Sequence, residues 1–228
     1  MSTSAIAAKF DEWADAGRDA SMESGHQDVV EQVVAQLGIG PGQQILDLGC
    51  GNGWATRMLA KSAAGSGAVG VDASPKMIKR AEELHSFTIR ARYEVAHFDA
   101  LDFKDGHFDR AFSVEALYYS PDLAAALAEV HRVLKPGGRL DTVMDFYTGR
   151  PGVEGWPAGV GLDMQNLDEA GWTAALEAAG FGEVRCQRVV DRRGPGDEGS
   201  FQPSEWYPDW ASRVAYHEAG SLWVSATR

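Results

Sequence analysis

A short apolar run followed by alternating glycines constrains this chain more than any other feature. Residues 44–48 predict a buried strand, Gly49, Gly51 and Gly53 predict a tight turn, and residues 54–62 predict a helix. Because glycine has no Cβ, the backbone of this turn can approach a ligand closely, and the first N–H groups of the helix point toward it. Such a unit predicts a parallel α/β sheet with a nucleotide-like ligand at the carboxyl ends of its strands.

Strands and helices alternate through the rest of the chain. This alternation predicts a parallel sheet with helices on both faces, and 228 residues fit one such domain. We expect an N-terminal helical lid (1–37), a ligand-binding half (38–146) and a substrate-side half with long loops (147–228) within the single domain 1–228. The further expected strands are 68–72, 92–96, 108–113, 139–146, 184–190 and 221–227, and the main expected helices are 5–37, 54–62, 124–134, 168–179 and one opened by Ser74 and Pro75.

Acidic residues lie at the carboxyl ends of three successive strands, at the predicted ligand edge. Asp47 precedes the glycine turn, where a carboxylate suits a ligand with an ammonium and a sulfonium group better than a pyrophosphate. Asp72 ends the second strand, where a carboxylate accepts hydrogen bonds from ribose hydroxyls. Asp99 follows the third strand and is placed to accept from an adenine amino group. The glycine spacing also differs from the G-x-G-x-x-G pattern of dinucleotide sites, which disfavours a nicotinamide-dependent oxidoreductase.

Four segments resemble the class I S-adenosylmethionine-dependent methyltransferases. Residues 45–53 (ILDLGCGNG) resemble the first motif of that family, and residues 70–77 (GVDASPKM) resemble its second-strand motif. Residues 108–113 and 130–138 are similar to its fourth strand and to the helix and turn before its fifth strand. The resemblance covers residues 26–146 and is closest to small-molecule enzymes of the ubiquinone and menaquinone biosynthesis type. It implies a Rossmann-like, seven-stranded, mostly parallel sheet with helices on both faces and an antiparallel final strand.

The same resemblance implies S-adenosyl-L-methionine as the cofactor and S-adenosyl-L-homocysteine as the product. The glycine turn would contact the methionine part, the end of the second strand would hold the ribose and adenine, and the residues after the third strand would contact the adenine amino group. The residues implied in cofactor binding are Asp47, Gly49, Cys50, Gly51, Gly53, Asp72, Ala73, Met77, Asp99, Ala100 and Ser113.

The methyl acceptor leaves fewer signals in the sequence. Methyl transfer from a sulfonium requires an aligned nucleophile and the exclusion of water, and a general base only where the nucleophile must lose a proton. His26 is a candidate base or hydrogen-bond donor, with a structural or solvent-facing histidine as the alternative. Tyr118, after the fourth strand, is a candidate pocket residue or a core side chain. The stretches 148–161 and 192–210 are candidate substrate-facing loops or plain surface insertions.

Residues 5–30 are expected to form the mobile part of the N-terminal lid. They are mostly polar or small, and Phe10, Trp13 and Met22 are among their few bulky apolar side chains. So little apolar surface anchors a segment weakly, as opening and closing require.

The composition of the chain limits the kinds of molecule that it is expected to bind. The formal net charge is −12, and an acidic surface repels phosphate backbones, so we expect a small-molecule substrate and no nucleic acid. Cys50 and Cys186 are too few for a disulfide framework and lack metal-ligand spacing, so we expect a cytoplasmic protein with no bound metal. We expect this protein to be a monomer or a homodimer. No apolar run is long enough to span a membrane, and residues 1–10 lack a signal-peptide pattern.

Two questions stay open at this level. The acceptor atom can be oxygen, nitrogen or carbon, and the sequence does not separate an enzyme from a scaffold or regulator that binds S-adenosylmethionine. Both would carry the same ligand-site residues.

Overall fold

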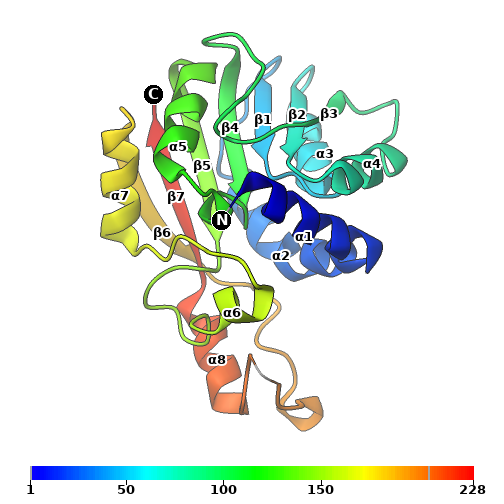
Figure 1. Cartoon of the computed structure of the whole chain (residues 1–228), viewed down its shortest axis with the longest axis vertical. Coiled ribbons are helices and arrows are strands. Elements are labelled where there is room, and N and C mark those ends of the chain that lie inside the picture. The colour runs from blue at the N-terminus through cyan, green and yellow to red at the C-terminus, as the bar shows by residue number, and fades with distance from the viewer. Residues whose placement is uncertain (1, 205) are drawn as a thin grey trace.

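A seven-stranded sheet forms the centre of the protein (Figure 1). The computed structural model describes residues 2–204 and 206–228, so Glu205 in the predicted 192–210 loop lies outside the described residues. The strands are β1 (Gln44–Leu48), β2 (Gly67–Asp72), β3 (Ala91–Val95), β4 (Phe108–Val114), β5 (Leu134–Met144), β6 (Gly182–Val189) and β7 (Ser221–Thr227).

The strand order confirms the predicted fold class. It runs β3-β2-β1-β4-β5-β7-β6, and the neighbours from β3 to β5 pair in parallel. β7 lies antiparallel between β5 and β6. The carboxyl ends of β1 and β4 meet where the strand order reverses, which is where open α/β sheets bind ligands.

Helices cover both faces of the sheet because successive side chains of a strand point to opposite sides. Ile45 of β1 belongs to an apolar cluster with Val33 and Leu59, whereas the adjacent Leu46 belongs to a second cluster with Leu127. No helix among the described residues is long and apolar enough to cross a membrane. The helices are α1 (Thr3–Asp15), α2 (Arg18–Val34), α3 (Trp54–Lys61), α4 (Pro75–Glu83), α5 (Leu123–Val133), α6 (Trp156–Val160), α7 (Glu169–Ala178) and α8 (Trp210–Ala219).

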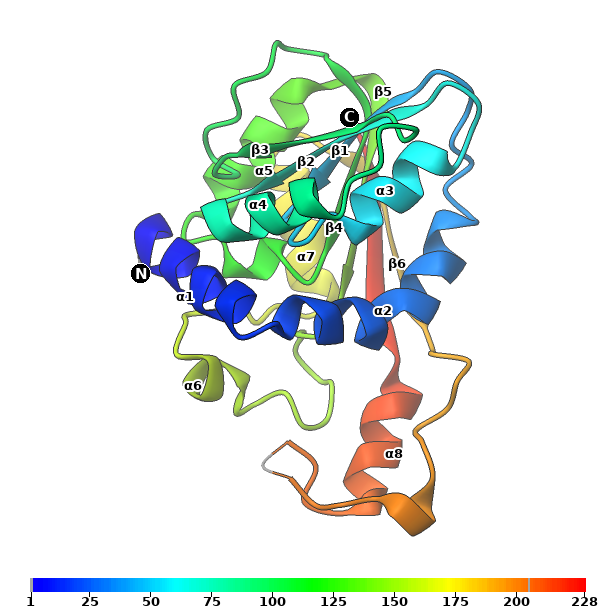
Figure 2. The same ribbon diagram turned by 90° about the vertical axis from the view of Figure 1, so that its right-hand side faces the viewer.

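The N-terminal segment departs from the single long helix expected over 5–37. Ala16 ends α1, and Gly17 with φ +67° precedes α2. Glycine adopts this left-handed conformation without steric cost, so the chain bends here and can follow the ligand edge of the sheet. Figure 2 shows α1 and α2 running along that edge.

The second half contains two helices that sequence patterning missed. α6 lies within the glycine-rich 148–161 stretch, and α8 follows the 192–210 stretch. Asp209 begins α8 by accepting a hydrogen bond from the N–H of Ser212 at 2.7 Å. α6 and α8 lie beyond the same end of the sheet as α1 and α2 (Figure 2).

Candidate active site

A cavity at the carboxyl ends of β1, β2 and β4, the cofactor cavity, contains most of the predicted cofactor residues. α1 and α2 close it from the other side with Ile6, Phe10, Trp13, Met22 and His26. The predicted residues that line it are Asp47, Gly49, Cys50, Gly51, Asp72, Ala73, Met77 and Asp99.

Three other predicted cofactor residues lie outside the lining of this cavity. Gly53 is the last residue before α3 and has φ +77°, so it bends the chain from the glycine turn into the helix. Ser113 is fully buried and donates a hydrogen bond to the carbonyl of Leu48 at 3.1 Å, which ties β4 to β1. Ala100 is exposed.

The glycine turn is shaped by close packing. A Cβ on Gly49 would lie 2.2 Å from the Cβ of Ala116, so only glycine fits beside the end of β4. The N–H of Gly51 donates to Oδ2 of Asp72 at 3.0 Å. This bond holds the turn against the end of β2. The backbone of the turn is therefore held in a single conformation beside the cavity.

Two buried carboxylates give the cofactor cavity its charge preference. Burial raises the pKa of Asp47 to about 7, against the hydrogen bond that it accepts from the hydroxyl of Thr56 at 2.6 Å. Burial also raises the pKa of Asp72 to about 6, against hydrogen bonds from the N–H groups of Ser74 and Gly51. A cationic ligand relieves this cost, because an opposite charge stabilises the ionised form.

The N-terminal segment is tied to the cofactor cavity by both polar and apolar contacts. Asp11 of α1 accepts a 2.5 Å hydrogen bond from the hydroxyl of Ser74. Asn52 of the glycine turn donates to Asp19 and Glu23 of α2 at 3.3 and 3.1 Å. Trp13 of α1 packs with Met77 in a small buried cluster, and the second half of α2 belongs to a core cluster. The end of α2 is therefore anchored in the core, and α1 with the start of α2 covers the cavity through mixed contacts.

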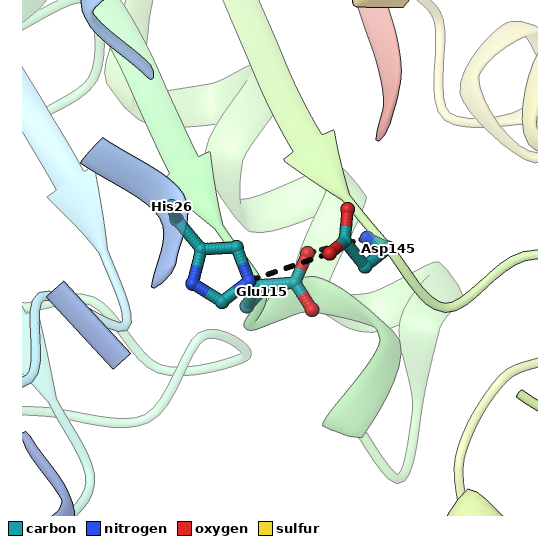
Figure 3. A group of neighbouring side chains, drawn as sticks. All are labelled: His26, Glu115 and Asp145. Carbon is teal, nitrogen blue, oxygen red and sulfur yellow. Dashed lines mark hydrogen bonds and ion pairs between the residues drawn. The ribbon is translucent and has the colours of Figure 1, made fainter. Parts of the chain in front are cut away.

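His26, Glu115 and Asp145 meet beside the cofactor cavity (Figure 3). Nε2 of His26 lies 3.5 Å from Oδ2 of Asp145, and Nδ1 lies 2.8 Å from the carbonyl of Met22. Burial opposes protonation of the ring, but the hydrogen bond to Asp145 and the charges of Glu115 and Asp145 outweigh it and raise the pKa of His26 to about 9. At neutral pH the ring is therefore a cation and a donor, and not a free base.

Glu115 is a site residue that sequence analysis did not single out. It follows β4 with φ +52°, a conformation that costs energy for any residue but glycine. The N–H of Asp145 donates to Oε1 of Glu115, and the hydroxyl of Tyr118 donates to Oε2 at 2.7 Å, so both contacts hold the carboxylate in place. Burial and the charge of Asp145 raise the pKa of Glu115 well above its usual value.

Asp145 carries the negative charge of this cluster. Its carboxylate accepts hydrogen bonds from Arg150 at 2.6 Å, Tyr216 at 2.7 Å and Ser221 at 2.5 Å. Burial would raise its pKa, but the charge of Arg150 and the contact with His26 hold it far below the usual range. These protein donors occupy the carboxylate that a metal ion would need, so the cluster is organised as a hydrogen-bond network.

A signal for Glu115 and Asp145 was present in the sequence. Both come directly after strands at the ligand edge, near which Asp47 and Asp72 also lie, but the residues after β4 and β5 form no recognisable motif. Their proximity depends on the parallel pairing of β4 with β5.

The structure separates the two adjacent tyrosines. Tyr118 is buried in the core and does not line the cofactor cavity, and its hydroxyl holds the carboxylate of Glu115 in position. Tyr119 lines the cofactor cavity instead.

A second cavity adjoins the first at His26, which lines both. It is formed by α2, the end of β5, α6, α8 and the loop that follows β6. Both glycine-rich stretches contribute, through Trp156 and through Gly194 and Tyr207. Its lining residues are Gly25, His26, Val29, Asp145, Arg150, Trp156, Asp191, Gly194, Tyr207, Arg213, Tyr216, His217, Gly220 and Ser221.

Known proteins resemble this chain most clearly in the cofactor half. Residues 45–138 match the methyltransferase domain family. The chain is 45% identical over 100 residues to 2-methyl-6-phytyl-1,4-hydroquinone methyltransferase of Synechocystis, covering 44% of this chain and 31% of that protein. It is 32% identical over 145 residues to an O-methyltransferase of Aspergillus sclerotiorum, covering 61% and 54%. The matches thus span about a third to a half of these relatives.

One solved structure matches almost the whole chain. It is a methyltransferase in complex with the Trm112 methyltransferase activator of Haloferax volcanii, with 29% identity, a TM-score of 0.88 and coverage of 96% of both chains. Together with the geometry of the cofactor cavity, these matches support a class I S-adenosylmethionine-dependent methyltransferase, with S-adenosylmethionine as its cofactor.

Proposed function

We propose that this protein transfers the methyl group of S-adenosylmethionine to a small molecule bound between the cofactor cavity and the second cavity. The observation that carries the proposal is the position of His26, which lines both cavities. A methyl group directed from the first cavity toward His26 would meet an acceptor that enters from the second.

The buried acids and the glycine turn suit the cofactor. Asp72 would accept hydrogen bonds from ribose hydroxyls, Asp99 would contact the adenine amino edge, and Asp47 would lie near the cationic end. The bound cofactor supplies a methyl group on a sulfonium, so the acceptor lone pair forms the new bond while the carbon–sulfur bond breaks.

Glu115 is the proposed proton acceptor where the nucleophile carries a proton. It lines the cofactor cavity, and its raised pKa lies nearer neutrality than that of an exposed carboxylate. His26, held as a cation between the carbonyl of Met22 and the carboxylate of Asp145, would place a positive charge beside the acceptor. The proton of the acceptor would then pass to Glu115.

The proposal also includes a cytoplasmic location and no nucleic-acid substrate. Both cysteines are free thiols, which fits a reducing compartment. The net charge of −12 disfavours polyanionic substrates.

A ligand panel with a turnover assay tests the proposal. S-adenosylhomocysteine should raise the melting temperature, because a ligand at a hundredfold excess over its Kd stabilises the folded state by about 2.7 kcal/mol. NAD and NADP should not. Release of S-adenosylhomocysteine with small-molecule acceptors would then separate an enzyme from a scaffold. Stabilisation by NAD alone contradicts the cofactor assignment.

We also infer a protein partner at the free edge of β3. Val95 of this strand, and Leu84 and Phe87 in the segment before it, are large apolar side chains exposed to solvent, and Phe87 is fully exposed. β3 is the outermost strand, so one row of its backbone groups is available to pair with another chain. The Haloferax volcanii relative was solved with an activator protein, and an activator of that kind is the proposed occupant.

Co-expression with the Haloferax volcanii Trm112 activator tests this surface. The wild-type chain should co-purify with the activator, and Phe87→Asp should abolish the complex. Val190→Asp, at another exposed apolar residue, is the matched control and should keep it. Loss of binding in both variants, or in neither, contradicts the assignment to the β3 edge.

A further inference from the structure

The second cavity differs in charge from the protein that contains it. The chain carries a net charge of −12, yet basic side chains outnumber acidic ones in this lining. The basic residues are His26, Arg150, Arg213 and His217, and the acidic residues are Asp145 and Asp191.

Both acids of the second cavity are already paired with protein cations. Asp145 accepts from Arg150 and lies beside the cationic His26. Asp191 is held by Arg193, whose Nη2 lies 2.5 Å from Oδ2, and this contact lowers the pKa of Asp191. Neither carboxylate is therefore free to neutralise a further positive charge in the cavity.

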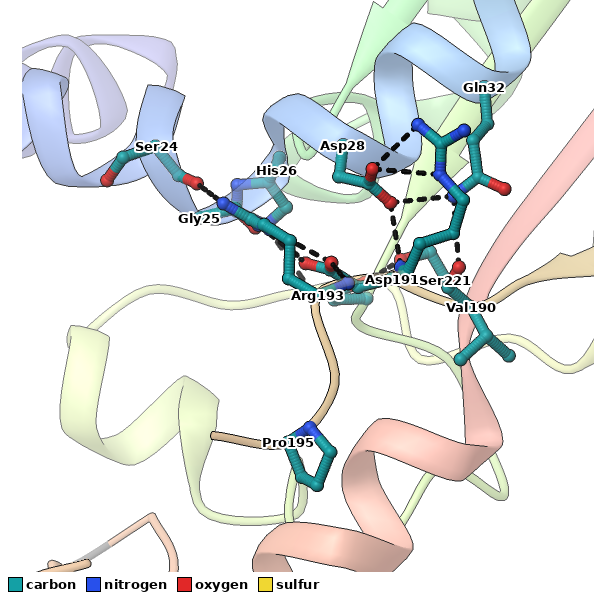
Figure 4. Close-up of polar contacts among 12 residues, drawn as sticks. Ser24, Gly25, His26, Asp28, Gln32, Val190, Asp191, Arg193, Pro195 and Ser221 are labelled. Atoms are coloured by element: carbon teal, nitrogen blue, oxygen red, sulfur yellow. Dashed lines mark hydrogen bonds and ion pairs between the residues drawn. The ribbon is translucent and has the colours of Figure 1, made fainter. Parts of the chain in front are cut away.

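Arg193 also fixes this wall of the cavity to α2 (Figure 4). Its Nη1 and Nη2 donate to the carbonyls of Ser24 and Gly25 at 2.7 and 2.9 Å. Arg192 adds an ion pair with Asp28 at 2.7 Å. The loop after β6 is thus held against the helix that carries His26, so the cavity has a defined shape.

Arg213 of α8 supplies a positive charge that no carboxylate of the described residues neutralises. Its Nε donates to the carbonyl of Pro195 at 3.1 Å, and its guanidinium lies 4.8 Å from the ring centre of Tyr207. No carboxylate among residues 2–204 and 206–228 forms an ion pair with it within 4.0 Å. Its remaining N–H groups can hold two oxygens of one carboxylate or phosphate, because a guanidinium is a planar fork of donors.

Arg150 provides a second, independent indication. Its side chain is 4% exposed, and its Nε is buried without a hydrogen-bond partner in the described structure. A buried unpaired donor is costly, and the side chain that carries it lines the second cavity. Its guanidinium lies 3.8 Å from the ring centre of Tyr216, and Tyr216 together with Trp156 and Tyr207 gives the cavity an aromatic wall.

We propose that the second cavity binds a small planar acceptor that carries a carboxylate or phosphate group, with this anion held by Arg213 and the ring packed against the aromatic wall of Trp156, Tyr207 and Tyr216. The opposite end of the acceptor, which carries the nucleophile, then faces His26 and Glu115. This inference rests on the proposed methyl transfer for the role of the bound molecule, but the anion site itself does not depend on it.

The test compares matched probes on the full-length protein. Affinities for 4-hydroxybenzoate, phenyl phosphate and the neutral 4-hydroxybenzamide are measured by calorimetry, with and without S-adenosylhomocysteine. We expect at least one anionic probe to bind about tenfold more tightly than the amide or better, since a hydrogen bond to a charged group contributes about that much. Arg213→Gln should abolish the difference and Arg213→Lys should keep part of it. Arg185→Gln, an exposed arginine on β6, is the matched control and should change nothing.

The outcomes separate the two proposals. Equal binding of the acids and the amide, unchanged binding in Arg213→Gln, or failure of both anions to bind at millimolar concentration overturns the anion site. If anions bind through Arg213 but S-adenosylhomocysteine does not bind at all, the anion site stands and the methyltransferase proposal fails.

Discussion

The cofactor cavity and the second cavity share His26 but draw their other residues from different kinds of chain segment. The predicted cofactor residues that line the first cavity lie between Asp47 and Asp99, at the ends of consecutive parallel strands and in the turns and helix that follow them. The second cavity combines α2 with the end of β5, α6, the loop after β6, and α8. One site follows from the sheet, and the other depends on how distant segments pack over it.

The two cavities also differ in the charge of their lining residues. The cofactor cavity places the buried acids Asp47, Asp72 and Glu115 where a cationic cofactor would lie. The second cavity carries the excess of basic groups that includes Arg213. This contrast indicates that the two halves select ligands of opposite charge, and the predictions below test each side of it.

The largest expected effect lies in the cofactor cavity. Asp72→Ala removes the proposed ribose acceptor and the partner of the Gly51 N–H. Hydrogen bonds to charged groups contribute about 1.5–3 kcal/mol, so the affinity for S-adenosylhomocysteine should fall about tenfold to a hundredfold or more. Calorimetry measures the change. Asp168→Ala removes an acid that begins α7 away from both cavities, and it should bind normally. Normal binding by folded Asp72→Ala would place the ribose elsewhere.

The next effect lies where the cavities meet. The pKa of His26 is about 9 in the folded protein against 6.5 in the unfolded chain, so its stabilising contribution is complete below pH 6.5 and is lost as pH rises through 9. The contribution amounts to ~3 kcal/mol at most. Between pH 6.5 and 9.5, the free energy of unfolding should therefore fall less in His26→Gln than in the wild-type protein. Urea titration at each pH measures this difference. An unchanged slope would show that the ring is not charged beside Asp145.

A smaller effect is expected from Tyr118. Tyr118→Phe leaves one oxygen of the buried Glu115 without its donor, which should reduce the free energy of unfolding by about 1–3 kcal/mol. Cofactor affinity should stay within a few-fold of wild type, because Tyr118 lines neither cavity. Loss of cofactor affinity with unchanged stability would instead make Tyr118 a binding residue.

The smallest expected effect concerns the proposed lid. Trypsin should cleave after Lys9 and Arg18 in the free protein, and several-fold more slowly once both cavities are filled, because ligands would hold α1 and α2 closed. Cleavage after the exposed Lys104 serves as the internal control. Equal protection at all three sites would indicate general stabilisation. Resistance at Lys9 and Arg18 in the free protein would mean that the segment is a fixed part of the fold, and cleavage there that ligands do not slow would mean that it does not close over the cavities.

Sequence reasoning succeeded where chemistry depends on local pattern. The apolar run and glycines at 44–53 predicted the turn, and Gly49 is confined by Ala116 as a close backbone approach requires. Ser74 and Pro75 predicted the start of α4, and the Ser74 hydroxyl accepts from the N–H of Met77 at 3.0 Å. These features act within a few residues, so composition and spacing are enough to identify them.

The same reasoning missed α6 and α8 and did not assign Glu115. Glycine and proline weaken the periodic signal of short helices, and α6 has only five residues. Glu115 has no motif of its own, and its conformation is imposed by contacts with Asp145 and Tyr118.

By itself, the sequence determined the sheet, the glycine turn and the acids at its ligand edge, because hydrophobic alternation and missing Cβ atoms act locally. Only the tertiary structure decided that His26 is charged, that Tyr118 supports Glu115 and that Arg213 faces an aromatic cavity. Each of these properties arises between residues far apart in the chain. Burial and neighbouring charge, which set a pKa or leave a cation uncompensated, exist only once those segments have packed together.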